Sequence, residues 1–309
     1  MAAPVTDRLS LAEPIRDALG DGRPVVALET SVLVQGLPPP RNLEAAEAMD
    51  EAVRSSGAEP AWVWVEGGAV RVGATLEELR ALAEDPSTAK AARRDLALVV
   101  AGARRGATTV SATVWAARRA GIEVAATGGI GGVHPGSGDV SADLLELART
   151  PMTLVCSGPK SILDPGATLE RLDELGIAIL GYRCDHLPFF VAREAPFSLD
   201  HRADRPEEVA AAARASRELG TGSALLVCNP VPEEAALDAD EVAAAVAGCH
   251  HQARSAGVTG TAVTPHLLRC LAEATAGRSL EANMALLRSN AALAGEIAAA
   301  LTSQATGAR

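Results

Sequence analysis

The chain has 309 residues, of which 48% are hydrophobic and only 2% aromatic, and its formal net charge at pH 7 is −11. This length suits one large α/β domain or two small ones. The acidic balance disfavours nucleic acid as a ligand, because a phosphate backbone requires a basic face. No apolar run reaches the roughly 18 residues needed to cross a bilayer, so we expect no membrane partner.

Two further features predict a cytoplasmic protein. The first twenty residues carry charges throughout and lack the apolar core of a secretory signal. The five cysteines are odd in number, widely spaced and without a C-x-x-C pair. That pattern predicts reduced thiols, with neither a disulfide framework nor a zinc site. The cysteines are Cys156, Cys184, Cys228, Cys249 and Cys270.

The first 85 residues alternate between apolar runs typical of strands and amphipathic stretches typical of helices. In chain order we expect a helix over 7–19, a buried strand over 24–29, a Pro/Gly-rich loop long enough to be a lid, a helix over 43–56 capped by Asn42, a β-hairpin over 61–73, and a helix over 76–84 behind a Thr75–Glu78 capping box.

The remaining residues continue the alternation. We expect a helix carrying Lys90, Arg93 and Arg94, strands over 107–110 and 122–127, a helix over 111–120, a helix over 142–149 capped by Ser141, and a strand over 152–158. Two strands within 176–191, a helix over 205–219, a strand within 223–234, helices over 238–256, 265–276 and 280–301, and a disordered tail over 302–309 follow. This order predicts a largely parallel sheet with helices on both faces. No repeat, linker or sharp change of composition divides the chain, so we expect a single α/β domain over residues 1–309.

A glycine-rich loop, residues 128–138, follows one of these strands directly and contains His134. Its glycines let backbone N–H groups converge on a ligand. The G-G-I-G-G pattern is not the G-x-G-x-x-G that opens a helix in dinucleotide-binding folds, so a nicotinamide cofactor is not expected. The helix after Ser141 offers its N-terminus to an anion, and Asp139 before it is placed to hold a metal.

Several reactive side chains follow predicted parallel strands, where open α/β sheets form their ligand crevice. Glu29 ends the first strand, and Lys160 follows the strand over 152–158. Lys90 and Lys160 are the only lysines among 28 basic residues. An amine can be deprotonated and attack a carbonyl, whereas a guanidinium cannot. The alternatives to a functional role are that Glu29 is solvated, that Asp139 caps a helix, that His134 is structural and that the two lysines are retained by chance.

The motifs VALET, KAARRDL, GATTV, ATGGIGGVH, DVSADL, SGPKSILD and NPVPEE occur in this order. Together they resemble the pseudouridine-5'-phosphate glycosidase family, also called indigoidine synthase A-like, over about residues 22–300. The resemblance implies a single α/β/α fold, a homotrimer and a divalent metal, usually manganese. It also implies cleavage of the C–C glycosidic bond of pseudouridine 5'-phosphate to uracil and ribose 5-phosphate.

The resemblance also implies site residues. Lys160 matches the nucleophile, Glu29 the proton donor and Asp139 the metal ligand. Matching substrate contacts are Lys90, Thr109, Val110, Ser141, Ala142 and Asp143, and His134 and Asn283 fall on further site positions. Three positions depart from the usual pattern: Thr30 where serine is frequent, Gly138 where an aromatic is frequent, and Pro159 where alanine is usual.

The implied chemistry suits these residues. A C–C glycosidic bond offers no leaving heteroatom to protonate, so the two carboxylates of ordinary glycosidases do not suffice. An amine, Lys160, can capture C1' as an iminium, and an acid, Glu29, can protonate the departing uracil carbon. Two alternatives remain at this point: a Schiff-base lyase or aldolase acting on another sugar phosphate, and a non-enzymatic protein that binds a sugar phosphate.

Overall fold

The computed structural model describes residues 8–136 and 138–303. In this part of the chain, eleven strands form one sheet in the order β1-β4-β3-β2-β7-β8-β11-β9-β10, with β5 and β6 pairing beside β3. The pairs are parallel except where β3 meets β4 and β6. The strands are β1 (Leu9–Leu11), β2 (Val25–Glu29), β3 (Glu59–Glu66), β4 (Ala69–Val72), β5 (Ala89–Ala91), β6 (Gly106–Thr108), β7 (Val124–Ala126), β8 (Thr153–Cys156), β9 (Ala178–Tyr182), β10 (Arg202–Ala203) and β11 (Leu225–Cys228).

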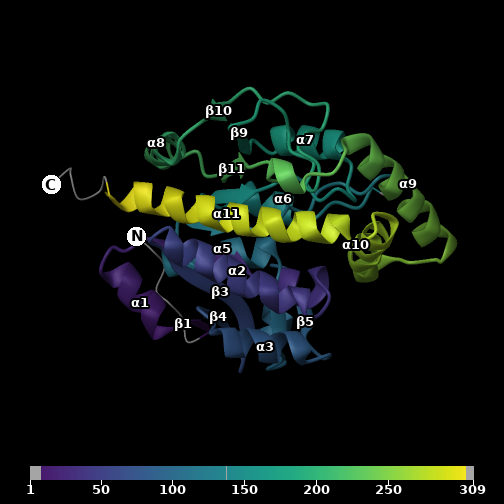
Figure 1. Ribbon diagram of the computed structural model, residues 1–309. Helices are drawn as coiled ribbons and strands as arrows, with labels where there is room; N and C mark the ends of the chain where they lie inside the picture. Colours follow the sequence, from purple (N-terminus) through teal and green to yellow (C-terminus); the bar gives the residue numbers. More distant parts are fainter. Residues whose placement is uncertain (1–7, 137, 304–309) are drawn as a thin grey trace.

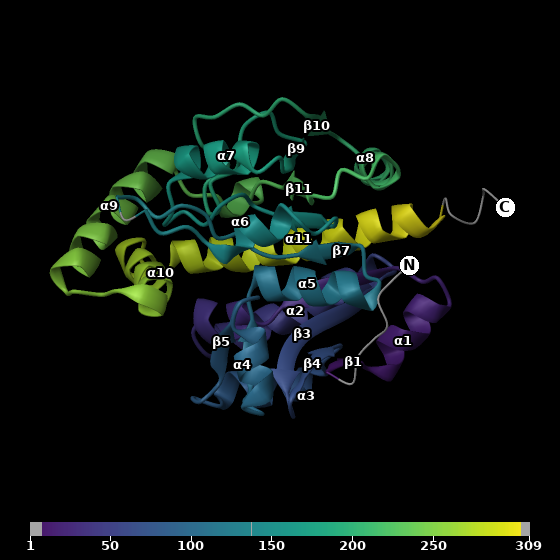
Figure 2. The same ribbon diagram turned by 180° about the vertical axis from the view of Figure 1, so that it is seen from behind.

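Helices cover both faces of the sheet. Figure 1 shows the long α11 crossing one face beside α2, and Figure 2 shows α5 on the opposite face. The helices are α1 (Glu13–Gly20), the π-helix η1 (Val32–Gly36), α2 (Arg41–Ser55), α3 (Leu76–Glu84), α4 (Leu96–Ala101), α5 (Val110–Ala120), α6 (Ala142–Leu147), α7 (Pro165–Glu174), α8 (Pro206–Leu219), the 3₁₀ turns η2 (Glu233–Ala235) and η3 (Gly260–Ala262), α9 (Ala239–Ser255), α10 (Val263–Ala274) and α11 (Arg278–Ser303). The predicted α/β class with a largely parallel sheet between helices is confirmed.

Alternate side chains of the central strands enter two separate cores. In β2, Val26 and Leu28 pack with α2 and α11, while Val25 and Ala27 pack with α1 and α5. Strand side chains point alternately to opposite faces, so a strand covered on both faces is apolar throughout. This explains why the run over 24–29 shows no polar alternation and why it lies at the centre of the sheet.

The topology brings four loops together. Strands β2, β7, β8 and β11 are consecutive parallel neighbours, so their carboxyl ends lie at one edge. The segments leaving that edge begin at Thr30, Thr127, Ser157 and Asn229. Open α/β sheets bind ligands at this edge, which directs attention to these four segments.

Two helices expected from sequence are wrong in part. Of the helix expected over 7–19, residue 7 lies outside the described residues, and the remainder divides into strand β1, which pairs with β4, and helix α1. Pro14 lacks an N–H and tolerates only the first turn of a helix, so the helix begins at Glu13. Lys90 lies in β5 rather than in a helix, because pairing with β6 overrides the helical preference of Ala-Lys-Ala.

Three smaller expectations also change. Asn42 lies inside the first turn of α2, where its Nδ2 donates to Leu33 O (2.9 Å), and Pro40 occupies the N-cap. The stretch 176–191 forms one strand, β9, because Arg183 and Phe190 adopt positive φ and interrupt extended pairing. Thr302 and Ser303 belong to α11 and not to the expected disordered tail; residues 304–309 lie outside the described residues.

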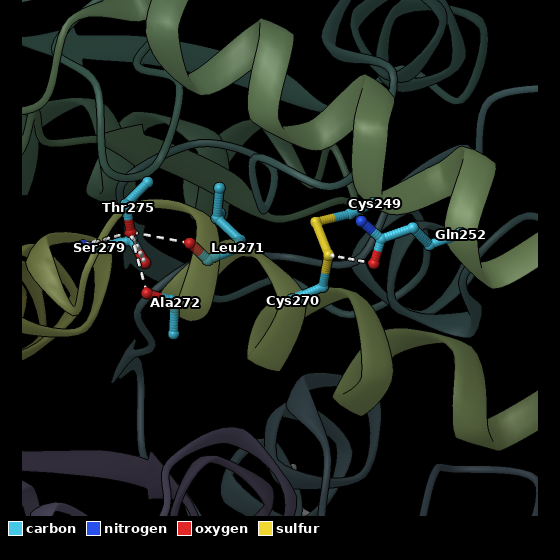
Figure 3. The surroundings of a disulfide bond; sticks show 7 residues. All are labelled: Cys249, Gln252, Cys270, Leu271, Ala272, Thr275 and Ser279. Carbon is cyan, nitrogen blue, oxygen red and sulfur yellow. Dashed lines mark hydrogen bonds between the residues drawn. A yellow bond between two sulfur atoms is a disulfide. The ribbon is translucent and has the colours of Figure 1, made fainter.

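The prediction that no disulfide forms is wrong. Cys249 on α9 and Cys270 on α10 are joined by a disulfide (Figure 3). The two cysteines are 21 residues apart in sequence, and their pairing depends on the packing of α9 against α10, which spacing alone does not reveal. The other three cysteines, Cys156, Cys184 and Cys228, are buried free thiols. No described helix is both long and apolar enough for a membrane span.

Candidate active site

A cavity of about 310 Å³ opens at the carboxyl edge of the sheet. Every residue predicted from sequence for the site lines it, which places in one space side chains separated by up to 254 positions in the chain (283 − 29). The eleven residues are Glu29, Lys90, Thr109, Val110, His134, Asp139, Ser141, Ala142, Asp143, Lys160 and Asn283. Their placement agrees with the predicted site, and their individual roles stay predictions.

Glu29 ends β2 and is only 4% exposed. Both of its carboxyl oxygens accept hydrogen bonds: Ser31 Oγ donates to Oε2 at 2.5 Å, and Thr127 Oγ1 donates to Oε1. Thr127 follows β7, the strand beside β2. The two hydroxyls therefore fix the orientation of a buried carboxyl group at the wall of the cavity.

Lys160 enters the cavity from the segment after β8. Its backbone N–H donates to Ile130 O (3.1 Å), and its Nζ donates to Gly129 O. Both acceptors belong to the glycine loop, so this loop fixes the lysine at its backbone and at its amine. Ile162, two residues after Lys160, is fully buried in a small separate core with α9 and α10.

Lys90 projects from β5 into the same cavity. Burial lowers its pKa, and the positive charge of Lys160 lowers it further, against smaller opposing effects of Asp143 and Glu29. These interactions show that the two amines and two carboxylates share one electrostatic environment. Two closely placed amines in a partly buried cavity form a favourable site for an anionic group.

Asp143 is buried and its carboxylate is held by backbone amides. Oδ1 accepts from Ser111 N and Oδ2 from Gly131 N, each at 2.9 Å. Ser141 caps α6 as predicted, accepting from Asp143 N (3.2 Å). Asp143 thus ties the start of α5 to the glycine loop. A side chain on Gly131 would meet Ser141 Oγ at 2.2 Å, so the close approach requires glycine there.

His134 and Asp139 face each other across a turn of the glycine loop. His134 N donates to Asp139 O at 2.9 Å, and Val133 pairs with Val140. Burial lowers the pKa of His134, while the charge of Asp139 opposes that shift. Asp139 itself is exposed at the cavity. Among the described residues no three His, Cys, Asp or Glu side chains gather as a metal cage.

The three departures from the family pattern are accommodated. Thr30 is buried, donates to Val63 O (2.7 Å) and accepts from Thr108 N (2.9 Å), so its hydroxyl joins β2 to two neighbouring segments. Gly138 has φ +66°, which favours glycine. Pro159 pairs with Ile130 beside the lysine.

Sequence reasoning missed part of the cavity wall. Thr127 follows β7 directly and Ser31 lies two residues after the end of β2, so the strand-end rule that indicates Glu29 also indicates these two residues. Helix α10 carried no such signal, because its placement depends on packing between distant segments. Its contributions, with the turn before it, are Gly260, Thr264, Pro265 and Leu268.

The fold and cavity are those of an α/β enzyme whose cleft opens at the carboxyl ends of parallel strands. The family described as indigoidine synthase A like protein matches residues 14–300. This chain belongs to that family.

Curated relatives in the family carry a functional name. The pseudouridine-5'-phosphate glycosidase of Symbiobacterium thermophilum is 49% identical over 300 residues, covering 95% of this chain and 97% of the relative. The enzyme of the same name from Methylobacterium nodulans is 48% identical over 296 residues, covering 95% of this chain and 88% of the relative.

Solved structures are also similar. An indigoidine synthase A-like protein of Thermotoga maritima superimposes with a TM-score of 0.86 and 41% identity, covering 91% of this chain and 94% of that chain. The prealnumycin C-glycosynthase AlnA, crystallised with ribulose 5-phosphate, gives a TM-score of 0.90 and 39% identity, covering 98% of this chain and 100% of that chain.

Proposed function

We propose that this protein is a pseudouridine-5'-phosphate glycosidase, which reversibly cleaves the C–C bond between uracil and ribose 5-phosphate. The observation that carries the proposal is that the Lys160 amine and the buried Glu29 carboxyl group line the same cavity. The names of the curated relatives support the same substrate.

The proposed reaction uses Lys160 as nucleophile and Glu29 as acid. As the Lys160 amine forms a bond to C1', the C1'–O4' bond of the sugar ring breaks, and O4' gains the proton that the amine nitrogen loses. Glu29 then protonates C5 of uracil, the C1'–C5 bond breaks, and the nitrogen lone pair forms the C=N bond of an iminium. Water hydrolyses the iminium, which releases ribose 5-phosphate and returns the free amine.

The remaining cavity residues would bind the substrate. The Lys90 amine would contact the 5'-phosphate, and phosphate binding would oppose the effects that lower the pKa of this amine. The Oδ1 atom of Asn283 is buried and has no hydrogen-bond partner among the described residues, so it suits an N–H donor of the ligand. The assigned substrate contacts also include Thr109, Val110, His134, Ser141, Ala142 and Asp143.

A divalent cation, with Mn²⁺ as the expected ion, is part of the proposal. The donor set fits an ion that keeps most of its water ligands, since Asp139 offers one exposed carboxylate and the described residues provide no protein cage. When bound, the ion would supply positive charge, through its waters, toward the uracil end of the substrate.

The proposal also includes that the protein is a homotrimer and that it is located in the cytoplasm. The trimer follows from the family resemblance. Three buried free thiols support the cytoplasm, and the Cys249–Cys270 bridge is the feature that argues against it.

The direct test is an assay with pseudouridine 5'-phosphate and Mn²⁺, followed by chromatography. We expect loss of substrate with equal amounts of uracil and ribose 5-phosphate. Lys160→Arg should keep the fold, because it preserves length and charge, but should abolish turnover. Binding of ribose 5-phosphate without uracil release by the wild type would favour a different sugar-phosphate lyase or a binding protein.

A further inference from the structure

One buried amide lies beneath the active-site loops without entering the cavity. Asn290 is in the middle of α11 and has no exposed surface. Its Nδ2 donates to Thr127 O (2.9 Å) and lies 3.3 Å from Gly128 O. The same Nδ2 lies 3.1 Å from Ser157 Oγ. Its Oδ1 accepts from Asn229 Nδ2 at 2.9 Å.

These partners lie just after the carboxyl ends of three neighbouring strands. Thr127 and Gly128 follow β7, Ser157 follows β8, and Asn229 follows β11. One side chain from α11 therefore connects the carboxyl ends of three adjacent strands, the edge at which the cavity opens. Polar groups at this depth require such partners, because an unpaired buried donor or acceptor destabilises the folded state.

The segment that Asn290 holds also contacts both reactive side chains. Thr127 Oγ1 donates to Glu29, and the carbonyl of Gly129 accepts from Lys160 Nζ. The three consecutive residues from Thr127 to Gly129 thus contact both the Glu29 carboxyl group and the Lys160 amine. A displacement of this segment would move both groups relative to the substrate.

We propose that Asn290 is a positioning residue, which sets the relative placement of Glu29 and Lys160 by fixing residues 127–129. The inference rests on the proposed function for the identity of the reaction. An apolar residue would be the ordinary choice here, since Leu286, Leu287 and Ala291 beside it on α11 are buried and apolar. Only an amide combines the donors for Thr127 O with the acceptor for Asn229.

The test compares Asn290→Ala and Asn290→Asp with a control on the same helix. The alanine variant leaves room for water, while the aspartate keeps the shape and loses the donors. We expect kcat per folded molecule to fall about tenfold to a hundredfold, because small displacements of reacting groups have effects of this size. KM should change much less, since the hydrogen-bond partners of the Asn290 side chain, which are Thr127, Gly128, Ser157 and Asn229, are not among the assigned substrate contacts.

Ile297→Ala is the matched control. Ile297 is fully buried, lies two turns further along α11 and is not part of the cavity wall. It should lower the melting temperature and leave kcat unchanged. An equal fall of kcat in this control would show a general effect of destabilisation and overturn the proposal. So would wild-type kcat in folded Asn290 variants.

A second readout separates this inference from the proposed function. Pyridoxal 5'-phosphate is a phosphorylated aldehyde that labels accessible amines, and borohydride reduction allows the label to be mapped by mass spectrometry. Labelling of Lys160 should be slower by a similar factor in Asn290→Ala, and unchanged in Ile297→Ala. If the wild type releases no uracil but this difference persists, the assigned reaction fails and the positioning role stands. Equal labelling rates would overturn the positioning role.

Discussion

Glu29 is the residue whose chemistry depends most clearly on its neighbours. Two hydroxyls, from Ser31 and Thr127, donate to its two carboxyl oxygens, and the side chain is almost fully buried. This arrangement suits a group that transfers one proton at a defined point. It also explains why the acid comes from a strand end rather than from a flexible loop, since β2 is paired on both sides.

Glu29→Gln should keep substrate binding and lose the proton transfer. The amide has the shape of the carboxyl group but no acidic proton, so we expect kcat to fall about 100-fold or more, within the usual contribution of acid catalysis, with little change in KM. Steady-state kinetics of uracil release measure both. Glu146→Gln is the control, because Glu146 is buried and pairs with Arg149 outside the cavity. A near-normal kcat in Glu29→Gln would refute the assigned role.

The lowered pKa of Lys90 predicts that the free energy of unfolding depends on pH. Burial and the charge of Lys160 lower its pKa below the ordinary 10.5. Below the lowered pKa the buried amine is charged, and its destabilising effect is fully present. As the pH rises toward 10.5, the folded protein loses this proton before the unfolded chain does, so the effect is relieved and stability rises.

Lys90→Met should remove that contribution. Urea denaturation from neutral pH to just below 10.5 should show a smaller rise in the free energy of unfolding for the variant than for the wild type. Identical pH dependence in the two proteins would contradict the lowered pKa of Lys90.

The Lys90→Met variant should also bind ribose 5-phosphate more weakly, which isothermal calorimetry can measure.

At the level of single residues, the sequence indicates which side chains line the cavity better than it indicates their contacts. Lys160 and Glu29 were found because they follow apolar runs and because lysine is rare in this chain. Thr127 and Asn290 were not found, because their roles depend on which strands are neighbours. Asp143 was expected to contact substrate, and the structure adds that its carboxylate ties two backbone segments.

Among the structural elements, the glycine loop depends on close packing. Gly131→Ala would place a Cβ 2.2 Å from Ser141 Oγ and 2.9 Å from Asp143 Oδ2. The loop or the start of α6 must then shift, so we expect KM for pseudouridine 5'-phosphate to rise at least about tenfold. Gly248→Ala on α9 is the control, because a Cβ there meets nothing within 4 Å. An unchanged KM in Gly131→Ala would show that the loop tolerates the displacement.

The disulfide between α9 and α10 should stabilise a wall of the cavity. It closes a loop with a sequence separation of 21, for which chain entropy predicts about 3 kcal/mol. The Cys249→Ser substitution should lower the free energy of unfolding by about this amount. The stability of the variant should then be the same with and without dithiothreitol. The wild type should lose similar stability when reduced. Equal urea denaturation curves with and without reductant in the wild type would exclude a stabilising bridge.

Most central elements could be predicted, and those at the edges could not. The runs that became β2, β7, β8 and β11 are apolar throughout because both faces are covered, and this pattern is visible in the sequence. The short strands β1 and β5 form through pairing with distant partners, against weak or helical local preferences.

For the molecule as a whole, strand order accounts for the site. Glu29, the glycine loop and Lys160 are far apart in sequence and meet because β2, β7 and β8 are adjacent and parallel. The switch-point rule predicted this convergence from the order of elements alone. The fourth side of the cavity, supplied by α10 and the turn before it, depends on packing that has no sequence signature.

The central claim is that Lys160 forms a covalent bond with the sugar. The protein is incubated with pseudouridine 5'-phosphate and Mn²⁺, reduced with borohydride during turnover, digested and analysed by mass spectrometry. The account predicts a reduced ribose 5-phosphate adduct on the peptide that contains Lys160, and no adduct at this position in Lys160→Arg. Full turnover without an adduct on Lys160, or an adduct on Lys90 alone, would contradict it.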